Sequence, residues 1–584
     1  MAKTIRRGKL TTAIASQSIN RSSGFRISRY APGLTIALLI GPVIFGFLGT
    51  LLPAIGYLPG LGGMEFTTAH FNALAQVPGL GRSIGVSIWI GLVTAFVSLV
   101  LTATFVGSYL GSKQFSTMRR LVAPLLSVPH AAAAFGLAFL IAPSGMLLRL
   151  VSPWLTGSDR PPDILIVHDP MGWTMMAGLI AKEIPFLFLV MLAALPQVDH
   201  EKTIRLGRSF GYGRLASFVF LVWPVVYRQI RLAVFAVLAY ASSVVDVALI
   251  LGPQLPAPLP VRLIGWMNDP DLAKRYLASA GAIVQFATTL CVIGMWLVLE
   301  KVGAVLVVSL RNRGLRFRRD GGMRMASLVG MASSAMIILL SIAVLAIWSV
   351  AGLWQFPDGF PDTLSLRSWM RALPQLSGPL LTTLGIAAVS SSIAVVLAIL
   401  CLERERDTGQ RRGQRSLLLL YLPLIVPQIS FLFGMQYLAI ITGIEGSFWG
   451  LTLAHLVFVL PYVFLALSDP WRSFDNRYDA IAAGLGLSRR RALVKIRIPM
   501  LLRVILTAFA VGFAVSVGQY LPTVLIGGGR LTTITSEAVA LAAGGNHRVI
   551  GVYAFLQTIL PGIGFLIAIA LPGLLFANRR GLRI

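Results

Sequence analysis

The sequence predicts an all-α polytopic membrane protein with twelve transmembrane helices, arranged as two parallel six-helix repeats. The first observation is composition: the 584 residues are 56% hydrophobic but only 12% charged, and soluble domains carry about 25% charged residues. The mean hydropathy is +0.79. The second observation is a series of twelve apolar runs that can each cross about 30 Å of hydrocarbon. The third is a basic loop that occurs twice, once in each half of the chain.

The apolar runs fall into two sets of six. Each run is apolar on all sides, so a helix would satisfy its backbone polar groups internally. The first set lies near residues 32–57, 84–110, 121–142, 171–195, 229–251 and 278–299. The second set lies near residues 327–351, 376–401, 417–442, 448–468, 501–526 and 549–576.

The distribution of charge predicts the orientation of these spans. The formal net charge is +28, and most Lys and Arg fall in alternate loops and in both tails, whereas the carboxylates divide evenly. This is the positive-inside pattern rather than a nucleic-acid-binding surface. We therefore expect an inner-membrane protein of bacterial type with both termini in the cytoplasm. The expected parts are a basic tail (1–31), a first module (32–310), a basic linker (311–325), a second module (326–577) and a tail (578–584).

The two basic loops share their glycine and proline positions. Gly211 and Pro224 stand thirteen residues apart, and so do Gly486 and Pro499, at an offset of 275 positions. Pro129 and Pro427 extend the repeat at an offset of 298. Both copies contain six spans, so they run parallel across the membrane, related by an axis along its normal.

Each loop is expected to form a knob of two short helices. Gly486 would stop the first helix in a left-handed conformation, Ser488 would cap the second, and Pro499 would open the next span. The first copy has helix-ending and helix-starting residues in the same arrangement, at Gly207, Gly211, Gly213 and Pro224.

These loops resemble the EAA loop of importer-type ABC permeases, whose pattern is E-A-A-x3-G-x9-I-x-L-P. Gly486, Ile496, Ile498 and Pro499 match that pattern in the second copy, and Gly211, Leu221 and Pro224 match it in the first. The Glu position holds Ala480, with Asp479 adjacent, and Arg205. The second Ala position holds Ala482 and Gly207.

The resemblance covers almost the whole chain and implies a type I ABC importer permease fold. It is closest to the fused permeases of the ferric-iron and thiamine group, especially the YnjC-type branch, through the stretches SVVDVALILGP and SVGQYLPT. It implies that the loops couple to an ATP-binding cassette subunit, present in two copies, and that a periplasmic substrate-binding protein delivers the solute. The expected solute is thiamine, ferric iron or another small polar compound.

Three polar residues in apolar segments are candidates for the translocation pathway: Asp246, Gln519 and Tyr520. An ionised Asp within a span costs about 2.5–3.5 kcal/mol on insertion scales, so it usually faces a bundle interior or a wet cavity. Matching SVVD to SVGQ pairs Asp246 with Gln519 at an offset of 273. An interhelical hydrogen bond is the alternative role. Lys182 and Glu183 also interrupt a span, and a structural role is expected for them.

The sequence contains no evident catalytic or cofactor site. Lys9 is the only lysine that follows a glycine, and Leu10 follows it, so no G-x4-G-K-[ST] phosphate loop exists. The six histidines show no metal-ligand spacing. The chain is therefore not expected to be an enzyme, and ATP hydrolysis would belong to a separate subunit. The alternative function is a twelve-helix secondary transporter without an ATPase partner.

Overall fold

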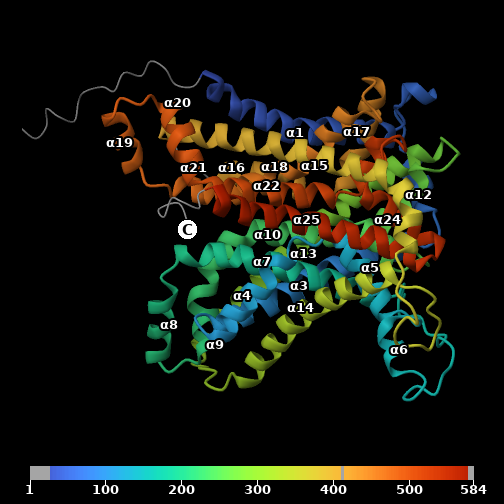
Figure 1. Ribbon diagram of the computed structural model, residues 1–584, viewed down its shortest axis with the longest axis horizontal. Helices are drawn as coiled ribbons and strands as arrows, with labels where there is room; N and C mark the ends of the chain where they lie inside the picture. Colours follow the sequence, from blue (N-terminus) through green and yellow to red (C-terminus); the bar gives the residue numbers. More distant parts are fainter. Residues whose placement is uncertain (1–25, 410–413, 576–584) are drawn as a thin grey trace, which may run out of the picture.

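The computed structural model describes residues 26–409 and 414–575 (Figure 1). Within these ranges the regular structure is helical, apart from two isolated β-bridges. Ten helices are long and apolar enough to cross a membrane, or up to twelve spans exist when each of two bent helix pairs counts as one. The predicted all-α polytopic fold is confirmed.

The first half runs from α1 to α13. Its elements are α1 (Arg26–Ala54), η1 (Pro59–Leu61), α2 (Ala69–Ala75), α3 (Leu80–Tyr109), α4 (Lys113–Leu125), α5 (His130–Ile141), α6 (Met146–Val151), α7 (Trp173–Ala194), η2 (Leu195–Gln197), α8 (His200–Ser209), α9 (Arg214–Ser217), the π-helical η3 (Phe218–Val222), α10 (Trp223–Ser243), α11 (Asp246–Leu251), α12 (Leu259–Met267) and α13 (Lys274–Asn312).

The second half runs from α14 to α25. Its elements are α14 (Gly321–Val350), α15 (Arg367–Thr408), α16 (Gln414–Ile425), α17 (Gln428–Ile441), α18 (Phe448–Arg472), α19 (Arg477–Gly484), α20 (Arg489–Ala492), the π-helical η4 (Leu493–Arg497), α21 (Ile498–Met500), α22 (Leu502–Val517), α23 (Leu521–Gly527), α24 (Ile534–Leu541), η5 (Ala542–Gly544) and α25 (His547–Leu575).

From α7 onward, the second half repeats the first at a constant spacing. α18, α20, α23 and α24 each begin 275 positions after α7, α9, α11 and α12. The spacing at α11 and α23 leaves no room for the two-residue shift that pairs Asp246 with Gln519. That alignment is wrong, and Asp246 corresponds instead to Leu521.

Several spans are broken rather than continuous. Residues 418–425 of α16 and the following α17 meet at 88°, and residues 489–500 meet α22 at 74°. In the first half, α4 and α5 are likewise separated by residues 126–129. Pro129 and Pro427 immediately precede α5 and α17. Proline lacks the N–H that a continuing helix would need, so each preceding helix ends before it and a new helix begins after it. The predicted run at 229–251 also divides, into α10 and α11.

The first helix of each half packs against the other half. α1 lies along α17 and α15, whereas α14 lies along α5, α3 and α7 (Figure 1). Glycine permits both crossings: a Cβ on Gly434 of α17 would overlap the Gly46 carbonyl oxygen of α1. A Cβ on Gly136 of α5 would overlap Ser341 of α14. Such close approach through small residues is a common basis of helix association in membranes.

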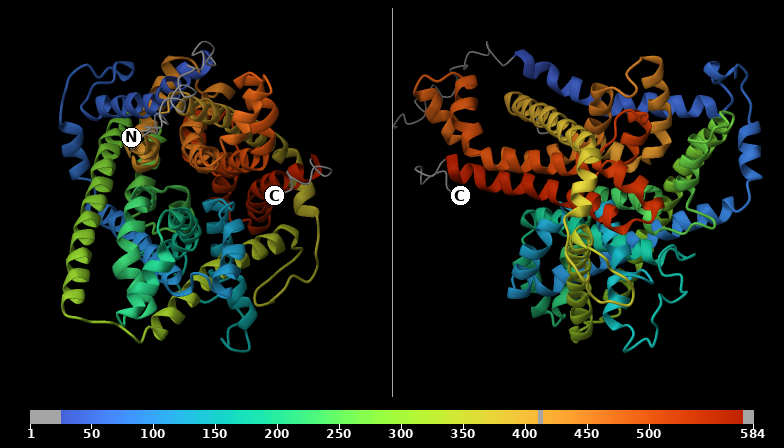
Figure 2. Two further views of the ribbon diagram at one scale, coloured as in Figure 1. Left: turned by 90° about the vertical axis from the view of Figure 1, so that its left-hand side faces the viewer. Right: turned by 45° about the vertical axis from the view of Figure 1, so that its right-hand side comes forward.

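The two predicted knobs lie at one end of the molecule. α8 and α9 are at the same end as α19 and α20, on the left of Figure 1, and α6 and α12 are at the opposite end. The left view of Figure 2 looks onto this end, where green first-half and orange second-half segments occupy separate regions.

Candidate functional site

The first knob, residues 200–222, turns through a left-handed glycine. Gly211 has φ +82°. Its N–H donates to the Arg208 carbonyl oxygen at 2.9 Å, and the Tyr212 N–H donates to the Gly207 carbonyl oxygen at 3.3 Å. These two bonds form a Schellman C-cap, which ends α8 and redirects the chain into α9.

The second knob, residues 477–497, repeats the same turn. Gly486 has φ +75°. Its N–H donates to the Ala483 carbonyl oxygen at 3.0 Å, and the Leu487 N–H donates to the Ala482 carbonyl oxygen at 2.9 Å. The left-handed stop predicted at Gly486 is confirmed, and Gly211 makes the equivalent turn.

Each turn is followed by one helical turn and then by a π-helical segment, η3 or η4. Pro224 lies in the first turn of α10. Pro499 lies in the three-residue α21, which precedes the 74° bend, so it does not open the long helix directly. Ser488 has the extended backbone of an N-cap, but its side chain makes no capping hydrogen bond. The predicted Ser488 cap is therefore wrong.

Small residues allow the two short helices of each knob to pack together. Gly207 and Ala482 are buried at equivalent positions. A Cβ on Gly207 would lie 2.6 Å from the Ser217 Oγ atom of α9. By contrast, Arg205 is exposed.

The segment between the halves packs on the first knob. We call residues 316–320 the linker strap. The Gly213 N–H donates to the Arg316 carbonyl oxygen at 3.0 Å, and the Phe317 ring lies 6.3 Å from the Phe220 ring. A Cβ on Gly213 would overlap the Phe317 carbonyl oxygen. Gly213 is therefore required by the path of the strap.

The strap also caps α9. Asp320 Oδ2 accepts a hydrogen bond from the Leu215 N–H at 3.1 Å. Leu215 is the second residue of α9, where an N–H has no partner inside the helix. Gly213, at the N-cap position, has no side chain that could serve, so Asp320 supplies the cap from a distant segment.

At the start of α8, the hydrogen bond from Lys202 lowers the pKa of Asp199.

Apolar contacts hold the inner side of the first knob. Ile204, Phe218 and Val222 are buried in a cluster with Phe105 and Phe188. The first knob is thereby anchored on α3 and α7 without an ion pair at these positions among the described residues.

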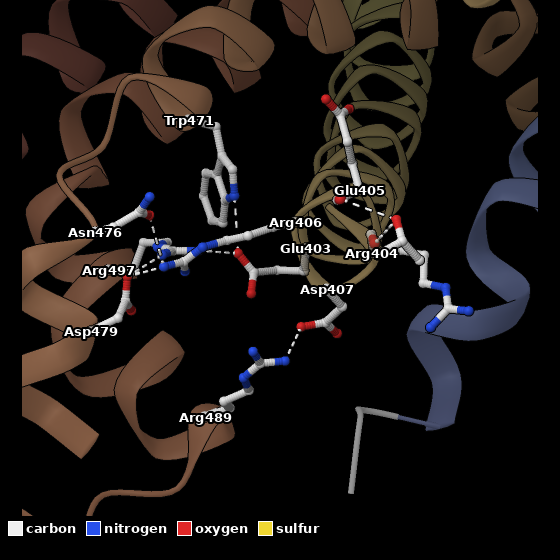
Figure 3. Close-up of polar contacts among 11 residues, drawn as sticks. Glu403, Arg404, Glu405, Arg406, Asp407, Trp471, Asn476, Asp479, Arg489 and Arg497 are labelled. Carbon is white, nitrogen blue, oxygen red and sulfur yellow. Dashed lines mark hydrogen bonds and ion pairs between the residues drawn. The ribbon is translucent and has the colours of Figure 1, made fainter. Parts of the chain in front are cut away.

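Ion pairs hold the inner side of the second knob (Figure 3). Asp479 and Arg497 stand where the first knob has Ile204 and Val222. Arg497 Nη2 donates to Asp479 Oδ2 at 2.6 Å. Arg406, from the end of α15, also pairs with Asp479. Asp479, adjacent to the motif's Glu position, is therefore engaged within the chain.

The Arg497 guanidinium is the centre of this network. Its side chain is 2% exposed and also pairs with Glu403 of α15. Its Cζ atom lies 4.9 Å from the Phe474 ring centroid and 5.8 Å from that of Trp471. The Trp471 indole N–H donates to Glu403 at 3.0 Å, so the charges are embedded between aromatic rings.

Both knobs present apolar side chains at equivalent places. Leu206 and Phe210 are 56% and 60% exposed on the first knob. Ile481 and Leu485, which stand 275 positions later, are 60% and 75% exposed on the second. Two matched apolar pairs therefore face outward at one end of the molecule.

Comparison with known proteins shows the kind of protein to which this chain is similar. The family "Binding-protein-dependent transport system inner membrane component" matches residues 394–579. The inner membrane ABC transporter permease protein YnjC of Escherichia coli is 28% identical over 94% of this chain and 97% of its own length. The chain is a binding-protein-dependent ABC transporter permease. The expected resemblance is confirmed.

A second relative is similar over most of the chain, and a third over a part of it. The thiamine transport system permease protein ThiP of Escherichia coli is 23% identical over 77% of this chain and 81% of its own length. The spermidine/putrescine permease protein PotC of Haemophilus influenzae is 28% identical over 24% of this chain. The permease is thus a multi-pass inner-membrane component that depends on separate ATPase and substrate-binding partners, and the secondary-transporter alternative is not supported.

Asp246, Gln519 and Tyr520 lie at the breaks in the interior of the permease. Asp246 is the first residue of α11, and Gln519 and Tyr520 lie between α22 and α23. Val245, next to Asp246, belongs to the same apolar cluster as Tyr520 and Leu521. The two breaks therefore border one apolar cluster, although Asp246 does not correspond to Gln519 in the repeat.

Lys182 has the structural role expected from the sequence. Its ammonium donates to the carbonyl oxygens of Leu125 and Leu126 at 3.1 and 3.3 Å. These carbonyls lie where α4 ends; the Leu125 carbonyl also accepts from the Val128 N–H at 3.3 Å, and carbonyls at a helix end need partners from outside the helix. The neighbouring Glu183 points to a different partner, because its Oε1 lies 3.4 Å from His130 Nε2.

Sequence reasoning missed several residues of the knobs and the interior. Asp320 could have been recognised from the sequence, because it is the only acidic residue between Glu300 and Asp358 and lies in a strongly basic linker. Arg497 was harder to recognise. Its only distinguishing feature in the sequence is that it directly precedes Ile498 and Pro499, where an apolar run begins. His130, which contacts Glu183, could not be singled out, because a lone histidine in an apolar run shows no ligand spacing.

Proposed function

We propose that this permease forms the membrane pathway for a small solute and docks two copies of an ATPase subunit through its two knobs. In this proposal the knobs act as EAA-like coupling loops and, with both termini, face the cytoplasm. ATP binding on the partner would move the two halves through these contacts. The observation that carries the proposal is the matched pair of exposed apolar side chains on two knobs at one end.

The geometry of the knobs supports this role. Each knob is held rigidly against the membrane helices, the first by apolar contacts and the linker strap, the second by ion pairs. A rigid element transmits displacement, whereas a flexible one absorbs it. An exposed apolar pair is suited to a groove on a partner, where burial contributes about 25 cal/mol per Å².

We further propose that Asp246, Gln519 and Tyr520 border the pathway. They lie where the helices of both halves are interrupted, and irregular backbone within a membrane is tolerated where it is buried in protein or lines a cavity. The solute would be thiamine, ferric iron or another small polar compound.

Docking can be tested by removing the apolar pair from each knob. Leu206→Asp with Phe210→Ser should weaken ATPase capture at the first knob, and Ile481→Asp with Leu485→Ser at the second. Capture by tagged permease in nanodiscs should fall in each double variant and be lost when both are combined. Leu364→Asp, an equally exposed apolar site between α14 and α15, is the control. Wild-type capture by the combined variant would refute the coupling role.

The pathway can be tested by cysteine accessibility. Cysteines at 246 and 519, in a background lacking Cys291 and Cys401, should react with a polar thiol reagent added from outside. Reactivity should change when ATP is trapped on the partner. Absence of labelling at both sites in every state would place them in packed protein or lipid and refute the pathway role, while leaving the docking test unaffected.

A further inference from the structure

We propose that the linker strap and the start of α14 bind an anionic phospholipid from the leaflet next to the knobs. Residues 315–325 have the sequence LRFRRDGGMRM, in which arginines are interspersed with apolar side chains. The apolar side chains of Leu315, Phe317, Met323 and Met325 are all exposed, by 42% to 61%. Basic residues beside exposed apolar ones are typical of segments that lie at a membrane surface.

Two guanidinium groups of the strap converge at the turn of the first knob. A Cβ built on Gly211 would lie 2.9 Å from Arg316 Nη1 and 3.3 Å from Arg318 Nη2. Both nitrogen atoms therefore lie within 3.3 Å of one point, although like charges repel one another at such a separation. Phe317, between the two arginines, has φ +41°, and strained backbone of this kind is concentrated at functional segments.

The backbone of the strap holds the two arginines in this position. The Arg316 carbonyl oxygen accepts a hydrogen bond from the Gly213 N–H at 3.0 Å. At the other end of the strap, Asp320 Oδ2 accepts from the Leu215 N–H at 3.1 Å. The strap is therefore fixed on both sides of the arginine pair, so the pair is available to a ligand without a large rearrangement.

No carboxylate balances the charge of this pair. Asp320 caps α9, and its nearest ion-pair partner is Arg324, at 3.9 Å. Within residues 26–409 and 414–575, no ion pair joins Arg316 or Arg318 to an Asp or Glu. In the second knob, by contrast, Arg497 pairs with two carboxylates. A phosphate beside Arg316 and Arg318 would offset their repulsion and accept charge-assisted hydrogen bonds from both.

The length of α14 places the pair near the lipid headgroups. α14 begins at the same end of the molecule as the knobs (Figure 1). Its 30 residues extend over about 45 Å, which matches the roughly 40–45 Å thickness of a bilayer with its headgroup regions. The first turn of α14 therefore lies at headgroup level, and the strap directly precedes it.

This position favours a lipid over a soluble anion or an acidic protein surface. Arginine clusters immediately next to a membrane span recognise anionic headgroups. The exposed Met323 and Met325 lie in the first turns of the same helix, where acyl chains can pack against them. One phospholipid can therefore use both the arginines and the apolar side chains of this segment.

The test uses the purified full-length permease and three probes: short-chain phosphatidylglycerol, short-chain phosphatidylcholine and inorganic phosphate. Saturable binding is measured as a shift in the thermal unfolding midpoint. Phosphatidylglycerol should bind about tenfold or more tightly than either other probe. Arg316→Gln with Arg318→Gln should weaken phosphatidylglycerol binding about tenfold or more and leave phosphatidylcholine binding unchanged.

Arg311→Gln with Arg313→Gln is the matched control, because it removes the same charge from exposed positions of the same linker. This variant should retain most phosphatidylglycerol binding. Equal losses in the two double variants would overturn the inference, since the effect would then come from net charge rather than from the converging pair. Phosphate binding as tight as phosphatidylglycerol binding would also overturn it, in favour of a soluble anion.

ATPase capture separates this site from the proposed docking surface. In nanodiscs of phosphatidylcholine alone, the Arg316 and Arg318 double variant should capture the ATPase as the wild type does. The Leu206 and Phe210 double variant should keep its phosphatidylglycerol binding even though it loses capture. Reduced ATPase capture by the arginine variant, with phosphatidylglycerol binding unchanged, would assign the pair to the ATPase interface and refute the lipid site.

Discussion

Gly213 and Ser488 occupy equivalent positions in the two knobs, and the difference between them follows from the linker strap. The strap passes so close to Gly213 that any Cβ would overlap the Phe317 carbonyl oxygen. Among the described residues, no backbone carbonyl accepts a hydrogen bond from the Ser488 N–H, and a side chain is tolerated there. Glycine is therefore needed at this position in the first knob, where the strap passes, and serine is accommodated in the second knob.

Gly213→Ser should displace the strap from the first knob. Overpacking of this kind costs about 1–3 kcal/mol, so residues 316–320 should become more accessible to trypsin at Arg316 and Arg318. Limited proteolysis of the purified permease measures this directly. Ser488→Gly is the matched control and should leave cleavage unchanged. Equal cleavage of the Gly213 variant and wild type would mean that the strap does not depend on this contact.

The Asp479–Arg497 pair invites a double-mutant cycle against its apolar counterpart, Ile204 and Val222. Arg497→Val alone removes the ion-pair partner of Glu403 and one of the two partners of Asp479, and removing one partner of a buried pair costs about 3–5 kcal/mol. Asp479→Ile combined with Arg497→Val recreates the first knob's pair and should recover part of that loss. Thermal unfolding of the single and double variants measures the coupling. Strictly additive losses would show that the two residues act independently.

Individual residues were predictable where local backbone chemistry decides them. Gly211 and Gly486 were predicted because positive φ strongly favours glycine at a helix end. Arg497, Asp320 and His130 were not, because their partners come from elements distant in the chain. Such pairings depend on the tertiary arrangement, which the residue pattern of one loop does not contain.

At the scale of elements, the two knobs share one backbone geometry but use different means of attachment. The Schellman turn, the short helix and the π-helical segment recur at 275 positions. An apolar cluster and a strap hold one knob, and an ion-pair network holds the other. Under the proposed docking, two identical ATPase subunits would therefore meet knobs of the same backbone shape that are held to the membrane helices by different contacts.

Gly211→Val and Gly486→Val should both disturb coupling, but unequally. A β-branched residue in the left-handed region costs about 1–2 kcal/mol or more. A Cβ at Gly486 meets open space, whereas one at Gly211 would lie 2.9 Å from Arg316 Nη1 of the strap. ATPase stimulation should fall further for Gly211→Val. Asn at each site tolerates this conformation and should be milder; equal losses for the two Val variants would contradict the asymmetry.

The breaks within spans were the elements least visible in the sequence. Hydropathy does not register a change of direction, so residues 121–142 and 229–251 each read as one continuous run. Pro129 and Pro427 signalled the breaks before α5 and α17. The break between α10 and α11 contains no proline and had no comparable signal.

At the scale of the whole molecule, the exchange of α1 and α14 between the halves ties the two repeats together. The sequence predicted twelve spans in two sets of six from length and composition, and the described residues contain ten helices long enough to cross a membrane, or up to twelve spans when each bent pair counts as one. The sequence did not predict the exchange. Glycines such as Gly46 and Gly434 permit a close helix crossing, but they do not indicate which helix will be the partner.

This exchange predicts that the halves remain together after the linker is cut. A protease site inserted between Gly314 and Leu315 lies outside the strap, and cleavage there should leave both fragments in one peak on size-exclusion chromatography. A site inserted between Gly157 and Ser158, within the first half, is the control for the effect of cleavage itself. Separation of the linker-cleaved fragments would show that helix exchange does not hold the halves together.

The exchange also sets the order in which contacts can form during synthesis. α1 leaves the ribosome early, but its crossing partner at Gly434 is made roughly 390 residues later, which is about 20–80 s at ordinary elongation rates. Throughout that interval the face of α1 that carries Gly46 and Gly49 must remain in lipid or with an insertion factor. The first half therefore cannot reach its final packing as an independent unit. The packing of α1 can be completed only after the second half of the permease has been made.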